Sequence, residues 1–308
     1  MHIDLKLASN LLEIDVDKVN IDIRMWEDLS KYSTFRIGGR AKYLIKVSTR
    51  EELVNAVNLF RHANIPFYIL GGASNVLIDD KDWDGGVIVT KTPPKDFKYN
   101  NGLIEVFSGD YLPALIHKLA SWDIGGWEFL VGVPGTIGGA IVMNAGTQER
   151  GICDFVDKIE ILGTDGKTYI VDKQDLNWGY RYCEFPIDGI ITRAWLRVYD
   201  KPSSEILNFI QEHMVWRREH QPVGKPCAGS FFKNPQEKPA GYLIDKAGLK
   251  GYKIGGAQVS EKHANFIINT GNATASDVLT LASHIKQVVF DIFGIELVEE
   301  VKFIAHDI

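Results

Sequence analysis

The sequence contains few cysteines, and they lie far apart. Cys153, Cys183 and Cys227 form neither a Cys-x-x-Cys pair nor a cluster with histidine. Structural zinc sites and disulfide frameworks need characteristic cysteine spacings, so neither is expected and no metal is predicted. An odd number of widely spaced cysteines is typical of proteins in a reducing compartment, which predicts a cytoplasmic location.

Long apolar runs and an excess of positive charge are also missing. No stretch approaches the roughly 20 apolar residues that a membrane helix needs. The N-terminal segment holds acidic residues early and has no apolar signal-peptide core. With 34 Lys and Arg against 40 Asp and Glu, the net charge is −6, which argues against nucleic acid as the main partner. We therefore expect a soluble protein without a membrane, nucleic-acid or obligatory protein partner.

The chain does contain a repeated strand–helix–strand pattern, and its 308 residues suffice for two or three compact units. A predicted strand over 42–47 precedes a helix with Thr49 as N-cap and Glu52 three residues later. The following strand, over 66–70, runs directly into Gly-Gly-Ala-Ser-Asn at 71–75. A glycine turn after a strand is a common place for backbone amides to bind phosphate.

A second such unit and several further elements follow. Asp110 is expected to cap a helix. We predict a hairpin over 156–172, helices over 203–220 and 276–293, and a last strand over 295–304. The inner face of the helix after Asp110 is predicted to hold Leu112, Leu115, Ile116 and Leu119.

A glycine-rich, uncharged stretch, GVPGTIGGAIVMNAG, occupies residues 132–146. Its glycines lack the G-x-G-x-x-G spacing of a dinucleotide fingerprint. A P-loop in GTDGKT is excluded because Ile161 stands where the motif needs a glycine. The glycines of 132–146 permit either close packing of a buried crossover or the approach of backbone amides to a ligand. The partner turn at 71–75 favours ligand binding, with both turns around a pyrophosphate.

Three isolated residues are candidates for chemistry. Ser230 lies outside any G-x-S-x-G elbow, and a lone serine is most often a turn or cap residue. For Arg181 the alternative to a catalytic role is a surface ion pair, which is the commonest role of an arginine. Glu300 follows Glu299 in a predicted strand, so the two face opposite ways and one of them can point inward as a buried acid.

Together, eight motifs in order resemble the UDP-N-acetylenolpyruvoylglucosamine reductase family, flavin enzymes of bacterial cell-wall precursor synthesis. The resemblance runs from about residue 32 to residue 304. The motifs are YSTFRIGG (32–39), LGGASNVL (70–77), FLVGVPGTIGGAIVMNAG (129–146), GYRY (179–182), AGSFFKNP (228–235), AGYLIDKAGLKG (240–251), VSEKHANFIIN (259–269) and IELVEEV (295–301). Each motif alone is weak, but the set is specific.

The resemblance implies an α+β fold with an FAD-binding region of the vanillyl-alcohol-oxidase type. The expected division is an N-terminal lead-in (1–30), FAD-binding subdomains (31–95 and 96–202) and a C-terminal α+β substrate domain (203–308). Neither glycine turn contains histidine or cysteine, so FAD is expected to bind non-covalently. The compact chain is similar to the shorter, type II class of the family.

The family motifs assign residues to three roles. Those assigned to FAD are Tyr32, Thr34, Arg36, Ile37, Gly38, Gly71, Gly72, Ala73, Ser74, Asn75, Pro134, Gly135, Thr136, Gly138, Gly139, Asn144 and Gly146. Those assigned to the UDP-sugar substrate are Lys233, Asn234, Arg218 and Lys262. Those assigned to catalysis are Arg181, Ser230 and Glu300.

In the implied reaction, NADPH reduces the flavin, which passes hydride to the terminal carbon of the enolpyruvyl group. Arg181 and Glu300 would stabilise the negative charge that develops, and Ser230 would protonate the adjacent carbon. The sequence departs from the family pattern at Ala73, Cys183 and His220. Two alternatives are an FAD-dependent oxidase of the same fold and a non-catalytic protein that binds flavin or a sugar nucleotide.

Overall fold

The computed structural model describes residues 22–94 and 97–305. Two compact units are present. The first contains residues 22–25, Tyr43–Gly72 and Gly85–Met214, and the second contains Trp26–Lys42, Ala73–Asp84 and residues 215–305.

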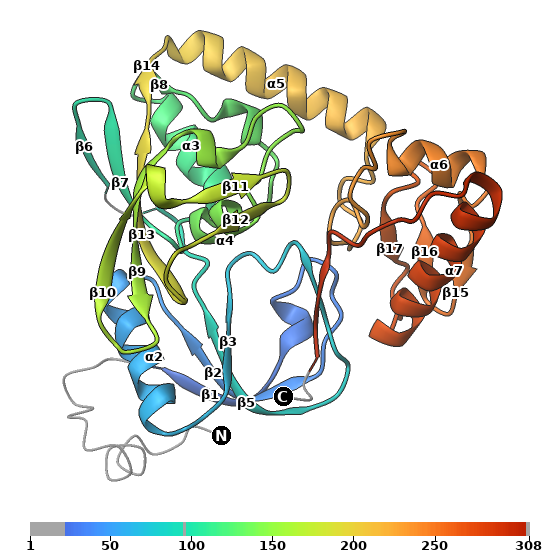
Figure 1. Cartoon of the computed structure of the whole chain (residues 1–308), viewed down its shortest axis with the longest axis horizontal. Coiled ribbons are helices and arrows are strands. Elements are labelled where there is room, and N and C mark those ends of the chain that lie inside the picture. Colours follow the sequence, from blue (N-terminus) through green and yellow to red (C-terminus); the bar gives the residue numbers. More distant parts are fainter. Residues whose placement is uncertain (1–21, 95–96, 306–308) are drawn as a thin grey trace. The chain divides into compact units, whose positions relative to one another are not determined.

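A five-stranded antiparallel sheet forms the centre of the first unit (Figure 1). Its strands, in spatial order, are β10 (Thr168–Asp172), β9 (Val156–Gly163), β13 (Gly189–Arg197), β7 (Leu103–Phe107) and β6 (Lys98–Asn100). Successive residues of a strand point to opposite faces. Val106 and Ile161 therefore pack in one apolar cluster with helix α3 (Leu112–Ala120), whereas Phe107 and Leu162 pack in another with helix α2 (Arg50–His62).

The remaining elements of the first unit connect and cover this sheet. The helices are α2 (Arg50–His62), α3 (Leu112–Ala120), α4 (Ile137–Val142) and the start of α5 (Ser203–His220), with short 3-10 helices at Glu128–Leu130, Ile152–Asp154 and Lys173–Asp175. The small antiparallel pairs are β11 (Asn177–Gly179) with β12 (Tyr182–Glu184), and β8 (Ile124–Gly125) with β14 (Tyr199–Asp200).

A second sheet has the strand order β1–β2–β5–β3. Its strands are β1 (Ile23–Asp28), β2 (Arg40–Lys46), β5 (Trp83–Val89) and β3 (Phe67–Leu70), and β3 runs parallel to β5. The predicted strand–helix–strand unit of β2, α2 and β3 is confirmed. Thr49 caps α2 as expected, because its side chain accepts a hydrogen bond from the Glu52 N–H.

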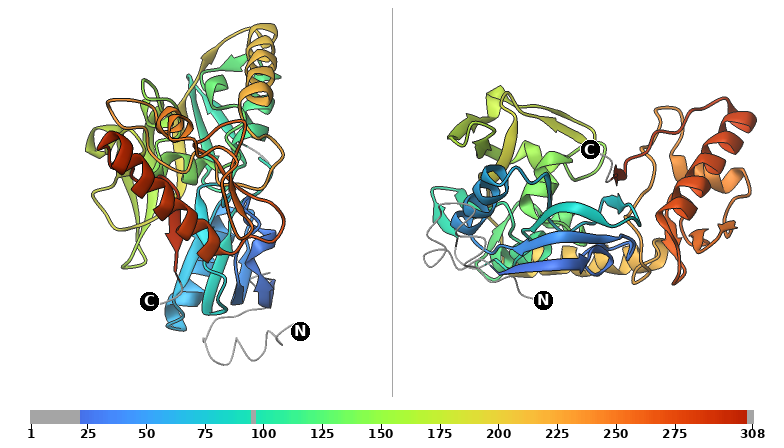
Figure 2. Two further views of the ribbon diagram at one scale, coloured as in Figure 1. Left: turned by 90° about the vertical axis from the view of Figure 1, so that its right-hand side faces the viewer. Right: turned by 90° about the horizontal axis from the view of Figure 1, so that it is seen from below.

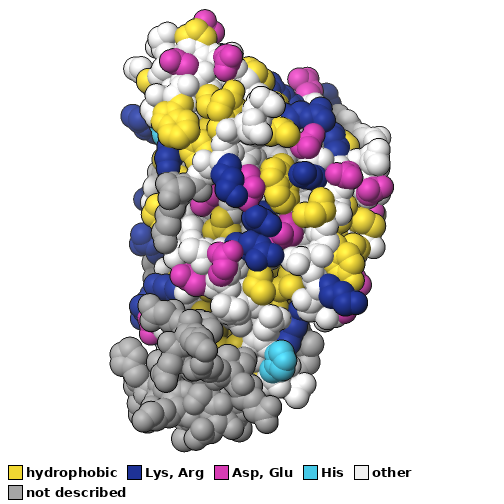
Figure 3. All heavy atoms as spheres, turned by 90° about the vertical axis from the view of Figure 1, so that its left-hand side faces the viewer, with side chains coloured by type: hydrophobic (Ala, Val, Ile, Leu, Met, Phe, Trp, Pro, Cys, Tyr) yellow, Lys and Arg dark blue, Asp and Glu magenta, His cyan; other side chains and the backbone are white. Residues whose placement is uncertain are grey.

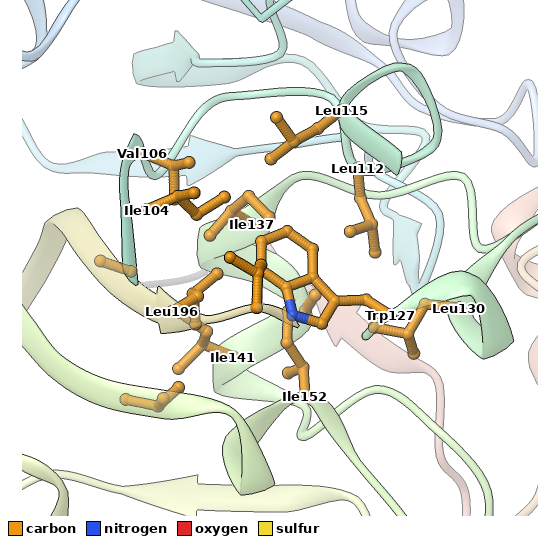
Figure 4. Close-up of a cluster of buried hydrophobic side chains, with 14 of the residues drawn as sticks. Ile104, Val106, Leu112, Leu115, Trp127, Leu130, Ile137, Ile141, Ile152 and Leu196 are labelled. Carbon is orange, nitrogen blue, oxygen red and sulfur yellow. The ribbon is translucent and has the colours of Figure 1, made fainter. Parts of the chain in front are cut away.

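The largest buried side chain of the first unit is Trp127, whose indole lies among Ile137, Ile141 and Ile152 (Figure 4). The Trp127 Nε1–H donates to the Arg197 carbonyl at 3.0 Å, which satisfies its polar atom inside the core. Since Ile137 and Ile141 belong to α4, this core fixes the helix that the glycine-rich stretch forms.

The second unit is built around helix α7 (Ala275–Phe293), which packs beside a three-stranded antiparallel sheet (Figures 1 and 2). The sheet contains β15 (Lys253–Ile254), β16 (Ala257–Val259) and β17 (Ile267–Asn269). The other elements are a 3-10 helix (Leu29–Lys31), β4 (Val76–Ile78), α6 (Ala240–Lys246) and β18 (Lys302–Ile304). Strand β4 pairs in parallel with β18.

Two local predictions were wrong. Asp110 does not cap α3: the N-cap is Tyr111, and the Asp110 carboxylate instead accepts the Phe107 N–H of its own turn. The last strand spans only Lys302–Ile304, because the residues before it bond to a loop rather than to a strand. The inner face predicted for α3 is confirmed as buried.

The surface contains charges of both signs. On the face in Figure 3, Lys and Arg side chains lie among Asp and Glu side chains. On the five-stranded sheet, Arg193 pairs with Glu105 at 2.7 Å and Arg197 with Asp157 at 2.9 Å. Among residues 22–94 and 97–305, no helix is long and apolar enough to cross a membrane.

Candidate active site

The turn after β3 presents a run of backbone N–H groups. In the described part of the chain, the N–H groups of Gly71, Gly72, Ala73 and Ser74 donate no hydrogen bond to another residue. Ala73 has a left-handed backbone, with φ of 43°. Consecutive N–H groups around a left-handed residue form a concavity that suits anions, so this turn fits the pyrophosphate of FAD.

Close packing against the second glycine-rich stretch explains two of these glycines. A Cβ atom on Gly71 would lie 2.3 Å from Thr136 Oγ1, and one on Gly72 would lie 2.3 Å from the Pro134 carbonyl oxygen. Neither contact is sterically possible. Gly71 and Gly72 are therefore in direct contact with the stretch 132–146 within the first unit, and only glycine permits this approach.

The N–H groups of the stretch 132–146 are largely engaged within the protein. Those of Ile137 and Gly138 donate to the carbonyls of Asp110 and Ser108, and that of Gly139 donates to the hydroxyl of Thr136, the N-cap of α4. These contacts support the packing interpretation of its glycines, and the ligand-binding interpretation of this stretch stays a prediction. Packing does not require Gly139, since a Cβ there would meet Thr136 Oγ1 at an ordinary 3.6 Å.

In the second unit, the segment 32–38 joins two of the predicted site segments. The Thr34 N–H donates to the Ala73 carbonyl at 3.2 Å, and its hydroxyl donates to the Cys227 carbonyl at 2.8 Å. Arg36 has a left-handed backbone, with φ of 55°, and the Asn269 side chain binds the Arg36 carbonyl. This segment therefore fixes the end of the glycine turn relative to the loop that carries Ser230.

The structure brings Ser230 and Glu300 together in the second unit. The Glu300 N–H donates to the carbonyl of Phe231, the residue after Ser230, at 2.8 Å. The Glu300 carbonyl accepts from Asn75 Nδ2 at 3.1 Å. Glu300 is buried, whereas Glu299 pairs with Lys286, which confirms the expectation that one of the two glutamates points inward.

The side chain of Ser230 is half-buried and follows Gly229, which has a φ of 77°. Its hydroxyl makes no hydrogen bond to another residue within the described ranges. Asn265 holds the loop in place, because its side-chain oxygen accepts the Phe232 N–H and its amide donates to the Phe232 carbonyl. Within the described ranges the Ser230 hydroxyl is thus not engaged by the protein, and its loop is bonded through the backbone to the buried Glu300.

Arg181 lies in the first unit, at the tip of the β11–β12 hairpin. Tyr180 and Arg181 form the two-residue loop, and Arg181 has a φ of 65°, where glycine or asparagine is favoured. Its guanidinium donates to the Gly146 carbonyl at 2.9 Å and lies 5.0 Å from the centre of the Tyr180 ring. The hairpin therefore holds Arg181 against the end of the glycine-rich stretch.

Two of the four predicted substrate residues have side-chain partners in the second unit. Lys262 Nζ donates to the Arg218 carbonyl near the end of α5 at 2.6 Å, and Asn234 Oδ1 accepts from the Ala240 N–H. His263, which follows Lys262, was not among the residues predicted from the sequence. Burial, with the positive charge of Lys250 nearby, lowers the pKa of His263. The only sequence signal for His263 was its place in the VSEKHANFIIN motif.

Two family models match the chain. One, described as the C-terminal domain of UDP-N-acetylenolpyruvoylglucosamine reductase, matches residues 221–304, and the other, an FAD binding domain, matches residues 41–172.

Curated relatives and a solved structure are similar over nearly the whole chain. A UDP-N-acetylenolpyruvoylglucosamine reductase of Caldanaerobacter subterraneus is 39% identical, covering 96% of this chain and 99% of the relative. A reductase of the same name from Anoxybacillus flavithermus is 36% identical, covering 97% and 99%. The crystal structure of UDP-N-acetylenolpyruvylglucosamine reductase from Thermus caldophilus matches with a TM-score of 0.77 and 34% identity, covering 93% of this chain and 99% of that chain.

Proposed function

The chain belongs to the UDP-N-acetylenolpyruvoylglucosamine reductase family of FAD-dependent oxidoreductases, and on that premise we propose its reaction. It reduces the enolpyruvyl group of UDP-N-acetylglucosamine enolpyruvate and yields UDP-N-acetylmuramate, a precursor of peptidoglycan. NADPH is the proposed reductant. The cytoplasmic location and the domain division at 30, 95 and 202 belong to the same proposal.

We assign FAD binding first to the N–H groups of Gly71, Gly72, Ala73 and Ser74, because they have no partner among the described residues. The chemistry that FAD supplies, when bound, is transfer of a hydride from NADPH to the terminal carbon of the enolpyruvyl group. Neither glycine turn has a histidine or cysteine that would attach the cofactor, so binding is non-covalent.

The chain's own residues handle the charge and the proton of the reaction. Arg181 and Glu300 would stabilise the negative charge that develops beside the substrate carboxylate. Ser230 would donate its hydroxyl proton to the carbon that carries this charge, because a carbanion is a strong enough base to accept it. The observation that supports these roles is the Glu300 N–H···O Phe231 hydrogen bond of 2.8 Å, which sets the serine loop beside the buried glutamate.

Substrate binding is assigned to Lys233, Asn234, Arg218 and Lys262. The positive charges of Lys233, Arg218 and Lys262 suit the diphosphate of a UDP-sugar. The contacts of Asn234 and Lys262 within the protein leave further hydrogens on both side chains for a ligand.

The test separates the two half-reactions. The purified flavoprotein is reduced with NADPH without oxygen, and the enolpyruvyl sugar nucleotide is then added. We expect the flavin to be reoxidised by this substrate far faster than by dioxygen. A colourless protein that FAD does not reconstitute would contradict the proposal, and rapid reoxidation by air alone would favour an oxidase.

The role of Ser230 is tested in the same assay. Ser230→Ala should leave flavin reduction by NADPH near normal and slow reoxidation by the substrate by about 10²- to 10⁴-fold, the range for loss of a general acid. Ser276→Ala, at an exposed position on α7 in the same unit, is the matched control and should behave as wild type. Equal losses in both half-reactions of Ser230→Ala would rule out the proton-donor role.

A further inference from the structure

The side chain of Asn144, which the family motifs assign to FAD, has protein partners at both ends. Asn144 Oδ1 accepts from the Cys153 N–H at 3.0 Å, and Nδ2 donates to the Gly179 carbonyl at 2.9 Å. Asn144 is buried and has a left-handed backbone, with φ of 38°. These contacts direct the amide toward the hairpin that carries Arg181.

A second hydrogen bond joins the same two segments in the opposite direction. The Arg181 guanidinium donates to the carbonyl of Gly146, two residues after Asn144. Gly179 is the last residue of β11 and precedes the loop formed by Tyr180 and Arg181. Figure 1 shows this hairpin beside α4, and β12 contacts α4 directly. The two hydrogen bonds therefore hold the arginine loop at a fixed distance from the glycine-rich stretch.

The Arg181 loop needs such support because its backbone is unfavourable. Arg181 has a φ of 65° in a two-residue loop, and a side chain other than glycine or asparagine pays a cost there. A loop with a strained residue keeps its conformation only if surrounding contacts impose it. Asn144 supplies the contact on the strand that enters the loop.

We propose that Asn144 is a positioning residue for Arg181: its Nδ2–H···O Gly179 hydrogen bond fixes the hairpin so that the guanidinium is correctly placed for the reaction. This inference rests on the proposed role of Arg181. Asn144 acts through the hairpin and not by contact with FAD. Since a displacement of about 1 Å can cost about 100-fold in rate, losing this hydrogen bond should slow substrate-dependent flavin reoxidation by about 10- to 100-fold. FAD affinity and flavin reduction should stay unchanged.

The most informative variant is Asn144→Asp. The aspartate keeps an acceptor for the Cys153 N–H but replaces the Nδ2–H donor with an oxygen that faces the Gly179 carbonyl. Protonation of that carboxyl restores a donor. The reoxidation rate of Asn144→Asp, divided by that of wild type at the same pH, should therefore rise as the pH is lowered from 8 to 5. A ratio that is independent of pH would overturn the proposal.

A second variant covers the case in which Asn144→Asp does not fold. Asn144→Gly keeps the left-handed backbone and removes both hydrogen bonds. Its matched control is Asn64→Gly, since Asn64 has a similar φ of 52° but is exposed after α2. The control should reoxidise at the wild-type rate, whereas Asn144→Gly should show the 10- to 100-fold loss with unchanged FAD affinity. A loss of FAD affinity in Asn144→Gly alone would instead indicate a direct cofactor contact and overturn the inference.

A double-mutant cycle with Arg181 identifies the route of the effect. If Asn144 acts through Arg181, Asn144→Gly should cost much less in an Arg181→Ala background than in wild type. Full additivity would overturn the inference. The proposed function is tested separately, because its failure would appear as a wild-type protein whose reduced flavin is not reoxidised by the enolpyruvyl substrate.

Discussion

Asp110 is a buried carboxyl group beside the glycine-rich stretch. Its side chain accepts the Phe107 N–H at 3.0 Å, and its backbone carbonyl accepts the Ile137 N–H. Burial raises the pKa of Asp110 to about 6, although the hydrogen bond from Phe107 acts in the opposite direction. At neutral pH the folded protein therefore contains a carboxylate that its surroundings disfavour.

Replacing Asp110 with asparagine should stabilise the protein at pH 8. The folded-state pKa lies above the unfolded value, so the stability due to the protonated carboxyl is present below about pH 4 and is lost as the pH rises through 6. An asparagine side chain at this position would stay neutral and still accept the Phe107 N–H. We expect Asp110→Asn to raise the free energy of unfolding by about 1–3 kcal/mol at pH 8 and by little at pH 4, measured by urea denaturation.

The control for this prediction is Asp188→Asn, at an exposed position, which should change stability by less than about 0.5 kcal/mol. A stability difference for Asp110→Asn that does not grow between pH 4 and pH 8 would contradict the assigned titration.

At the level of single residues, the sequence identified which side chains to examine but not what they bind. Period-2 alternation correctly indicated that one of Glu299 and Glu300 points inward. The family motifs assigned Asn75 and Asn144 to FAD, whereas the structure shows their amides bound to the carbonyls of Glu300 and Gly179. Such contacts join residues that are far apart in the sequence, and residue type alone does not reveal them.

Ala73 departs from the family pattern, and its backbone conformation adds to the cost of that departure. As a ligand contact, its methyl group would matter only to a closely bound phosphate. With φ of 43°, Ala73 also adopts a left-handed conformation that costs an alanine about 1 kcal/mol relative to glycine. The cost of this substitution is therefore present even without a ligand.

Among the secondary-structure elements, strand β9 is joined to its neighbours by the buried side chain of Glu160. The Glu160 carboxylate accepts hydrogen bonds from Arg193 of β13 at 2.5 Å and from Arg50 of α2 at 2.6 Å. The Thr192 hydroxyl donates a third hydrogen bond to it. Burial alone would raise the pKa of Glu160, but these donors outweigh it and lower the pKa to about 2. The Glu160 carboxylate thus links the five-stranded sheet to helix α2.

Glu160→Gln should destabilise the first unit by about 3 kcal/mol at pH 7. The folded-state pKa lies below the unfolded value, so this stability is present above about pH 4.5 and is lost as the pH falls toward 2. Chemical denaturation of both proteins between pH 3 and pH 7 should therefore show converging stabilities at the acidic end.

Glu149→Gln, at an exposed position in the same unit, is the matched control and should match wild type throughout. A constant difference between Glu160→Gln and wild type over this pH range would show that lost packing, not lost charge, explains the destabilisation.

Elements with strong local signals were predicted well. The Thr49 cap of α2, the hairpin of β9 and β10 and the end of α7 at Gly294, with φ of 68°, each follow from a few neighbouring residues. The end of the chain was predicted less well. The apolar pattern of 295–304 is that of a strand, but Glu300 donates its N–H to the loop at Phe231, a contact that no local pattern encodes.

Over the whole molecule, the resemblance predicted the fold class, and the matches to an FAD binding domain and a reductase C-terminal domain confirm it. The sequence did not predict that Trp26–Lys42 and Ala73–Asp84 group with residues 215–305 in one compact unit. That grouping depends on long-range contacts such as the pairing of β4 with β18. The division at residues 30, 95 and 202 stays a prediction.

FAD binding should stabilise the whole protein by mass action, because the cofactor binds the folded chain and not the unfolded one. At a free FAD concentration 100 times the dissociation constant, the expected gain is about 2.7 kcal/mol. The glycine turn should decide whether this gain is realised. In Gly72→Ala, the new Cβ would lie 2.3 Å from the Pro134 carbonyl oxygen, so the turn must move away from the stretch 132–146.

We therefore expect Gly72→Ala to lose most of the FAD-dependent rise in the thermal unfolding midpoint, measured by calorimetry with and without added FAD. Gly166→Ala is the matched control. Gly166 has a φ of 80°, so alanine there costs stability, but no atom lies within 4 Å of its Cβ position in the β9–β10 turn. The control should unfold at a lower temperature yet keep the full FAD-dependent rise. Equal rises in the two variants would show that the contact of the two glycine turns is not needed for FAD binding.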